Sequence, residues 1–140
     1  MPRPFEIEVS FQVRFYDADS VGYVHNAVYF RWLEDLRTGL LAPHYSLERF
    51  VREGIAPVLT RAAIEYRSPL RLFDTFTGRA WVSKLDGLRW TVSHELVHAG
   101  KIAATAEQSG IFLNLSTHRP VPAPRELVEK FNAYQEQGSK

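Results

Sequence analysis

The sequence predicts an α+β fold in which an antiparallel sheet of about five strands wraps around one long central helix. Three observations predict it. A strongly apolar helical segment follows a single amphipathic strand, four further strand-like segments come after it, and tight-turn signals separate the last three of them. A helix with so much apolar surface requires burial on most sides, and a curled antiparallel sheet can supply that burial.

The first expected element is a strand over residues 5–15, where the odd positions are Phe, Ile, Val, Phe, Val and Phe and the even positions are mostly polar. Such alternation is typical of a strand with one buried face. Residues 16–25 break the alternation and are expected to form a loop. From Asn26 to Leu41 apolar residues recur at helical spacing, which predicts a helix with a wide apolar face. Asn26 is a good N-cap residue, and Pro43 marks the end of the helix.

The remaining elements are a short helix, four strands and a last helix. The short helix is expected at about residues 47–53. Strand-like segments follow at about 56–67, 74–85, 88–98 and 101–115. Their regular spacing, with Asp86-Gly87 and Ala99-Gly100 as turn signals, indicates an antiparallel meander. Three prolines between positions 120 and 124 predict an extended linker before an amphipathic helix at about 125–134.

Length and composition fit one domain over residues 1–140, with its core at about 5–128 and a C-terminal helix and tail at 124–140. The chain is 45% hydrophobic and 24% charged, which excludes a disordered chain, a coiled coil and a collagen-like repeat. Its 17 Lys and Arg residues nearly balance 16 Asp and Glu residues. No strong overall field therefore attracts nucleic acid or an anionic membrane, and we expect neither as a partner.

The chain has no cysteine, which excludes disulfides, thiolate catalysis and every Cys-based metal site. Its first residues contain no apolar leader segment, and no apolar run approaches the ~18 residues of a membrane-spanning helix. We therefore expect a soluble, cytoplasmic protein.

The loop before the long helix carries two aspartates. Asp17-Ala18-Asp19-Ser20-Val21-Gly22 begins like a calcium loop, but Val21 and Val28 stand where oxygen ligands are required. The structural alternative for Asp17 is a turn in which its side chain accepts backbone amides. Asp19 is a candidate catalytic residue. Unpaired amides at a helix start can hold an oxyanion while a nearby carboxylate attacks a carbonyl or deprotonates water.

A second motif, His94-Glu95-Leu96-Val97-His98, matches the H-E-x-x-H pattern of zinc peptidases. That chemistry requires a helix, in which residues four apart lie ~6 Å apart along the axis. In a strand they lie ~13 Å apart, too far for one metal ion. Residues 88–98 begin Leu-Arg-Trp-Thr-Val-Ser between two glycines, which favours a strand. A zinc metallopeptidase acting through His94, Glu95 and His98 is therefore a minor alternative.

Residues 15–30 read Phe-Tyr-Asp-Ala-Asp-Ser-Val-Gly-Tyr-Val-His-Asn-Ala-Val-Tyr-Phe. This segment resembles the signature of hotdog-fold acyl-CoA thioesterases of the 4-hydroxybenzoyl-CoA thioesterase type, approximately aromatic-x-D-T-D-x-x-G-H-V-N-N-x-x-Y-F and then E-x-x-R. Residues 64–74 resemble the Y-x-x-P-L-R-x-G-D turn of that family, and residues 117–122 its closing T-x-R-P-V-P. The resemblance spans about residues 8–128 and implies a hotdog fold, whose element order is the one derived above.

The chain departs from the family pattern at several positions. Ala18 stands in place of Thr, Tyr23 in place of His and His25 in place of Asn. Phe73 stands in place of the turn glycine, so that turn is not expected to adopt a positive φ easily.

The resemblance implies hydrolysis of an acyl-CoA thioester to free acid and coenzyme A, with Asp19 as nucleophile or general base. The amide of Asn26 and the helix dipole would stabilise the oxyanion, and no metal or bound cofactor is implied. Glu34 is open to two interpretations. Another hotdog branch has its catalytic Glu near this point, which would make Glu34 catalytic. Alternatively, Glu34 forms an ion pair with Arg37, three residues later, and has a structural role. His25 and Tyr23 are also possible catalytic or structural residues.

Substrate contacts are expected from a loop and from arginines suited to phosphate. The candidates are Tyr16, Gly22, Arg67, Arg71 and Arg119. We expect a homodimer or homotetramer with the active site at a subunit boundary, because a single curled sheet leaves edge strands open. Two other functions remain open: a hotdog dehydratase, which needs a His facing a carboxylate, and a non-catalytic acyl-CoA-binding module.

Overall fold

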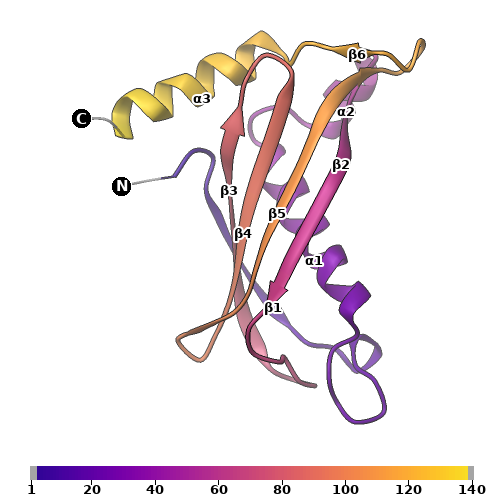
Figure 1. Ribbon diagram of the computed structural model, residues 1–140, viewed down its shortest axis with the longest axis vertical. Coiled ribbons are helices and arrows are strands. Elements are labelled where there is room, and N and C mark those ends of the chain that lie inside the picture. The colour runs from indigo at the N-terminus through magenta and orange to yellow at the C-terminus, as the bar shows by residue number, and fades with distance from the viewer. Residues whose placement is uncertain (1–2, 139–140) are drawn as a thin grey trace.

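The computed structural model describes residues 3–138, and one long helix packs behind one antiparallel sheet (Figure 1). The chain begins with β1 (Ile7–Gln12), a 3₁₀ turn (Phe15–Asp17), α1 (Asn26–Leu41) and α2 (Leu47–Arg52). It continues with β2 (Ile55–Tyr66), β3 (Thr75–Leu85), β4 (Arg89–His98), β5 (Lys101–Asn114), the short β6 (Pro120–Val121) and α3 (Arg125–Gly138). The predicted bounds of α1 are confirmed. The first strand is shorter than predicted at both ends, and the last helix continues beyond residue 134.

The sheet has the order β1-β3-β4-β5-β2, with β6 paired to β5. All of these pairings are antiparallel. The predicted meander is therefore correct for β3, β4 and β5 and wrong for β2, which pairs with β5 rather than with β3. The reason lies in the connections, because tight turns join β3 to β4 and β4 to β5, whereas residues 67–74 contain Pro69 and are too long for a hairpin.

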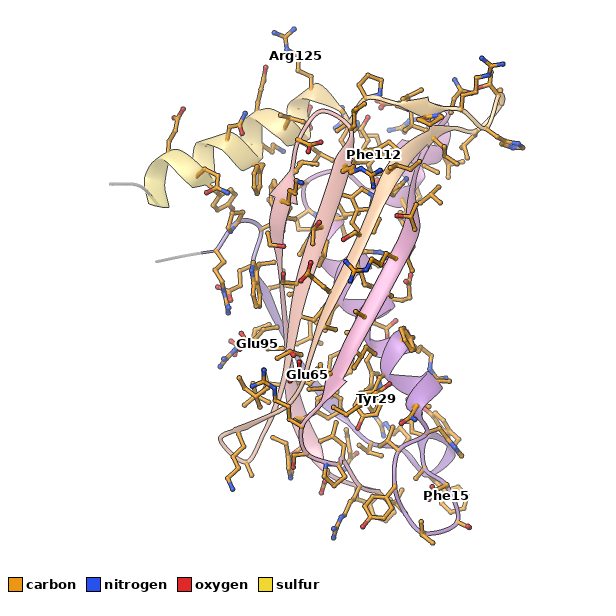
Figure 2. The ribbon with its side chains drawn as sticks, in the orientation of Figure 1. Phe15, Tyr29, Glu65, Glu95, Phe112 and Arg125 are labelled. Carbon is orange, nitrogen blue, oxygen red and sulfur yellow. The ribbon has the colours of Figure 1, made fainter. Side chains whose placement is uncertain are left out.

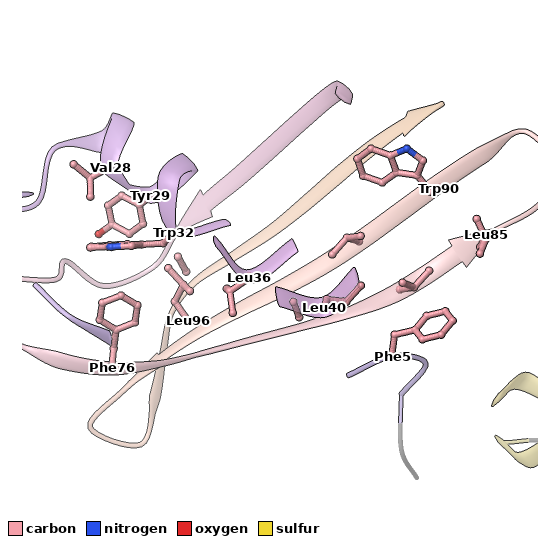
Figure 3. Close-up of a cluster of buried hydrophobic side chains, with 14 of the residues drawn as sticks. Phe5, Val28, Tyr29, Trp32, Leu36, Leu40, Phe76, Leu85, Trp90 and Leu96 are labelled. Carbon is pink, nitrogen blue, oxygen red and sulfur yellow. The ribbon is translucent and has the colours of Figure 1, made fainter. Parts of the chain in front are cut away.

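α1 buries one continuous apolar face against the sheet. The buried side chains that mark this face are Val28, Tyr29, Trp32, Leu36 and Leu40, and Figure 3 shows them in a line facing the strands. The helix approaches β3 closely at Gly78, where a Cβ atom would lie only 2.9 Å from Leu36 Cδ1. This packing fixes the position of α1, and with it the position of the loop that enters the helix.

A chain of polar side chains crosses this otherwise apolar layer. Buried His94 in β4 lies 3.0 Å from Gln108 Oε1 in β5, and Gln108 donates through Nε2 to Glu34 Oε1 at 3.4 Å. Arg37 donates to the other oxygen of Glu34 at 2.7 Å. Since the Gln108 carbonyl can only accept, His94 is protonated at Nε2. The chain links the sheet to the middle of α1.

Stability is expected to depend on pH through His94. Burial lowers its pKa from 6.5 to about 4, and the nearby Arg37 charge also lowers it. Between those two pH values the unfolded chain binds more protons, so the free energy of unfolding falls as pH decreases from 6.5 to 4, by on the order of 3 kcal/mol. Denaturant titrations across this window should show a flatter profile for His94→Gln than for an exposed control, His118→Gln. An equal slope in both variants would contradict this assignment.

The turn after β2 contains a strained residue. Phe73 adopts a φ of 69°, so the expectation that this turn avoids a positive φ is wrong. Its amide donates to Val13 O at 3.1 Å, and Val13 N donates to Asp74 O at 2.8 Å. These bonds to the end of β1 hold the turn in a geometry that costs a non-glycine residue roughly 1–2 kcal/mol.

Replacing Phe73 by glycine is therefore expected to stabilise the protein by up to about 1 kcal/mol, because relief of strain exceeds the entropy that glycine adds to the unfolded chain. Little packing is lost, since the side chain is 64% exposed. Denaturant midpoints measure the effect. Phe73→Ala is the control, because it removes the ring but keeps the Cβ, and a comparable gain there would exclude backbone strain as the cause.

Among residues 3–138, no helix combines the length and the apolar character needed to cross a bilayer.

Candidate active site

The two aspartates of the entry loop have different environments. Asp17 is 3% exposed, and its carboxylate accepts Arg14 N at 2.8 Å and Arg31 Nη2 at 3.0 Å. Its backbone carbonyl also accepts His25 N at 3.0 Å. Asp17 therefore anchors the loop to the start of α1, which is the structural role that the sequence offered for it.

Asp19 lies at the exposed end of the loop. Its Oδ1 accepts the amides of Val21 and Tyr23, both at 3.0 Å. Its own amide donates to Tyr23 O at 2.8 Å, so the loop closes on itself around this residue. Within the described part of the chain, Oδ2 accepts no hydrogen bond. One oxygen is thus held in place, in a residue that is exposed to solvent.

α1 begins with unpaired amides. Its N-cap is His25, with φ −63° and ψ 136° and no side-chain capping bond, so the prediction of Asn26 as N-cap is wrong. Asn26 is the first helical residue because Asp17 fixes the preceding backbone at His25. In residues 3–138 no acceptor is recorded for the amides of Asn26 and Ala27. The helix start therefore offers hydrogen-bond donors and partial positive charge beside the loop.

A cleft of about 300 Å³ opens at this helix start. Its lining residues come from the entry loop, α1, the last residue of β2 and the segment after it: Tyr23, Val24, Asn26, Tyr29, Tyr66, Arg67, Ser68, Pro69 and Leu70. Tyr29 packs edge-on against Tyr66, with ring centroids 4.9 Å apart. Burial raises the pKa of Tyr29, so its hydroxyl remains protonated.

The structure places three of the predicted site residues in the wall of this cleft. Asp19 is not one of them, although it accepts the amide of the lining residue Tyr23. Tyr23, Asn26 and Arg67 line the cleft, and Arg71 donates to the Tyr23 hydroxyl at 3.4 Å. Gly22 has a φ of 84°, which suits glycine, and its carbonyl accepts Leu72 N at 2.9 Å. Tyr16 is 71% exposed beside Phe15, which Figure 2 shows at the lower end of the molecule. Tyr29 and Tyr66 also line the cleft but were not predicted as site residues. The sequence signal for Tyr29 is the aromatic end of the entry signature, and that for Tyr66 is the first residue of the Y-x-x-P-L-R-x-G-D turn.

Two predicted site residues lie away from the entry loop and the cleft. Glu34 sits in the middle of α1 in its ion pair with Arg37. Arg119 lies beside β6 at the opposite end of the sheet, where its carbonyl accepts Asn114 N at 2.9 Å. Neither lines the cleft at the start of α1.

The H-E-x-x-H motif lies on β4, so the predicted strand is confirmed. His94 is engaged with Gln108 in the core, whereas Nδ1 of His98 lies 2.7 Å from Thr75 O. The two imidazoles therefore lack the helical arrangement that the zinc-peptidase mechanism requires. In the described part of the chain, no three His, Asp or Glu side chains are placed to share a metal ion.

The family profile and the curated relatives that this chain resembles point to thioesterases, and the solved structure that it resembles shares its fold. The family profile described as thioesterase-like superfamily matches residues 13–131. The putative acyl-CoA thioesterase YneP of Bacillus subtilis is 22% identical over 126 residues, covering 89% of this chain and 91% of that protein. The acyl-CoA thioester hydrolase YbgC of Escherichia coli is 25% identical over 122 residues, covering 86% of this chain and 91% of that protein. The protein SAV2348 of Staphylococcus aureus, solved in complex with CoA, superposes with a TM-score of 0.88 at 21% identity, covering 97% of this chain and 87% of that one.

Proposed function

The chain belongs to the thioesterase-like superfamily with a hotdog fold, and we propose that it hydrolyses acyl-CoA thioesters to a free acid and coenzyme A. The names of the relatives YneP and YbgC support this activity. The observation that carries the proposal is that the loop holding Asp19 by its Oδ1 leads directly into the start of α1, where the N-cap residue makes no side-chain capping bond. A cytoplasmic location is part of the proposal and rests on the sequence.

In the proposed mechanism, the thioester carbonyl lies against the start of α1 and its oxygen accepts the amide of Asn26. Asp19 then either attacks the carbonyl carbon, releasing the thiolate of coenzyme A and leaving an anhydride that water hydrolyses, or takes a proton from the water that attacks. In both routes the negative charge that develops on the carbonyl oxygen faces fixed N–H dipoles. The thiolate is a good leaving group, so no strong general acid is needed, and no metal or cofactor takes part.

Substrate binding is assigned to the cleft and its rim. The rings of Tyr23, Tyr29 and Tyr66 provide the walls for the acyl end, while Arg67 and Arg71 at the rim suit the phosphates of coenzyme A. Tyr16 and Gly22 are the further substrate contacts that the proposal assigns to the entry loop. The role of Glu34 in this proposal is structural.

We also propose that the protein forms a homodimer or homotetramer. β2 has a neighbour on one side only in the described sheet, which leaves the other edge of a twelve-residue strand open. Antiparallel pairing of this edge with a second copy places the Tyr66 end of one β2 beside the Ile55 end of the other. The cleft of one copy then approaches the β6 end of its neighbour, which is the end that carries Arg119.

Light scattering is therefore expected to give a mass of two or four chains. A fully active monomer of about 16.1 kDa would contradict an active site at a subunit boundary.

The activity itself is tested by incubating the protein with short, long and aromatic acyl-CoA esters and measuring release of free thiol. Thiol release by the purified protein supports the proposal. Binding of an acyl-CoA without thiol release identifies a binding module instead. Formation of an unsaturated product from a 3-hydroxyacyl-CoA, with the thioester intact, identifies a dehydratase.

A further inference from the structure

We propose that His98 and Asp74 form a positioning pair that holds the Asp19 loop in its working geometry. The inference rests on the proposed function, because it concerns the same carboxylate. It assigns a role to the second histidine of the H-E-x-x-H motif, which the proposed mechanism does not use. A series of hydrogen bonds and packing contacts links the pair to Asp19.

The Asp19 loop rests on the turn after β2. Leu72 donates to Gly22 O at 2.9 Å, and Val24 donates to Leu70 O at 3.2 Å. Tyr23 forms an isolated bridge with Arg71, whose guanidinium also lies 5.2 Å from the centre of the Tyr23 ring. Because the amide of Tyr23 holds Asp19 Oδ1, a shift of this turn moves the carboxylate as well.

Asp74 closes the turn. Its Oδ2 accepts the amide of Arg71 at 2.9 Å, and its own amide donates to Arg71 O at 3.0 Å. The strained Phe73 lies between these two residues. Strain of this kind persists only where several contacts enforce it, so the turn depends on what holds Asp74.

His98 holds Asp74 to the sheet. It is the last residue of β4, and its Nδ1 lies 2.7 Å from Thr75 O, which can only accept a hydrogen bond. Its Nε2 lies 3.6 Å from Asp74 Oδ2, and the two side chains are 33% and 27% exposed. The ring is thus fixed through Nδ1–H, and its Nε2 faces the carboxylate. In the imidazolium form Nε2 also carries a proton, and the resulting ion pair with Asp74 ties the turn to a rigid strand.

Loss of the pair is expected to let the turn relax, which displaces Tyr23 and the carboxylate that it holds. A misplacement of about 1 Å in a reacting group can reduce the rate by up to ~10²-fold. We expect His98→Ala and Asp74→Asn each to lower kcat by about 10-fold through partial displacement of Asp19. Asp74→Asn keeps an oxygen for the Arg71 amide and removes only the charge.

The experiment is a double-mutant cycle measured as kcat with an acyl-CoA and with the matching N-acetylcysteamine thioester, which has no phosphates. The double variant should lose no more than either single variant, because both remove one interaction. The loss should be equal with the two substrates, because it acts through Asp19 and not through phosphate binding. Glu129→Gln, which breaks the exposed Arg125–Glu129 pair on α3, is the control for loss of a surface ion pair.

A second measurement separates positioning from general destabilisation. Phe73→Gly removes the strain that the pair opposes, so adding it to His98→Ala should restore most of the lost kcat. Wild-type kcat in folded His98→Ala, multiplicative losses in the double variant, or recovery of stability by Phe73→Gly without recovery of kcat would each overturn the inference. The proposed function stands or falls separately, since it depends on thiol release from acyl-CoA esters by the wild-type protein.

Discussion

Asp19→Asn is expected to lower the rate of thioester hydrolysis by ~10²–10⁴-fold while the protein remains folded. The substitution preserves size and leaves one oxygen that can still accept the amides of Val21 and Tyr23. It removes the negative charge that attacks the carbonyl or takes the proton. Because the loop geometry is retained, KM for the substrate should change much less than kcat. Steady-state kinetics with the best acyl-CoA of the panel measure both quantities.

The matched control is Glu34→Gln, which changes the other carboxylate that the sequence offers for catalysis. Glu34 pairs with Arg37 and accepts from Gln108, so its substitution should reduce stability and leave kcat close to wild type. If Asp19→Asn kept most of its kcat and Glu34→Gln lost it, the helix carboxylate would be the catalyst. A thermal melt of each variant distinguishes loss of chemistry from loss of fold.

Local features of the fold were predictable because their signals are local. The apolar spacing between Asn26 and Leu41 specifies α1, and Asp86-Gly87 and Ala99-Gly100 mark the hairpins of β3, β4 and β5. The placement of β2 beside β5 was not predictable in the same way. It depends on where residues 67–74 lead the chain, and no local pattern encodes that path.

In the candidate site, too, local sequence signals were informative and tertiary contacts were not predictable. The signature locates Asp19 and the helix start, but the backbone at the N-cap His25 is held by Asp17, which in turn pairs with Arg31. The contact of His98 with Asp74 joins a strand end to a distant turn, and only the tertiary arrangement shows it. Preference alone favours Asn over His as a cap, which is why sequence reasoning chose the wrong residue.

Asn26→Pro tests the oxyanion role of a single backbone amide. In the proposed mechanism this N–H points at the carbonyl oxygen, and its removal should lower kcat by ~10²–10³-fold, the usual loss for one oxyanion donor. The helix should survive, because Asn26 is the first helical residue, where proline is well tolerated. The backbone of His25, at φ −63° and ψ 136°, is already in the region that a following proline requires.

Asn26→Ala is the matched control, since it removes the side chain and keeps the N–H. Because His25 and not Asn26 is the N-cap, this variant should lose little stability as well as little activity. Thermal melts accompany the kinetics of both variants. A folded Asn26→Pro protein with the kcat of Asn26→Ala would show that this amide does not hold the oxyanion. If Asn26→Ala alone abolished hydrolysis in a folded protein, the side chain itself would contact the reacting group, and the oxyanion site would have to be reassigned from the backbone to the carboxamide of Asn26.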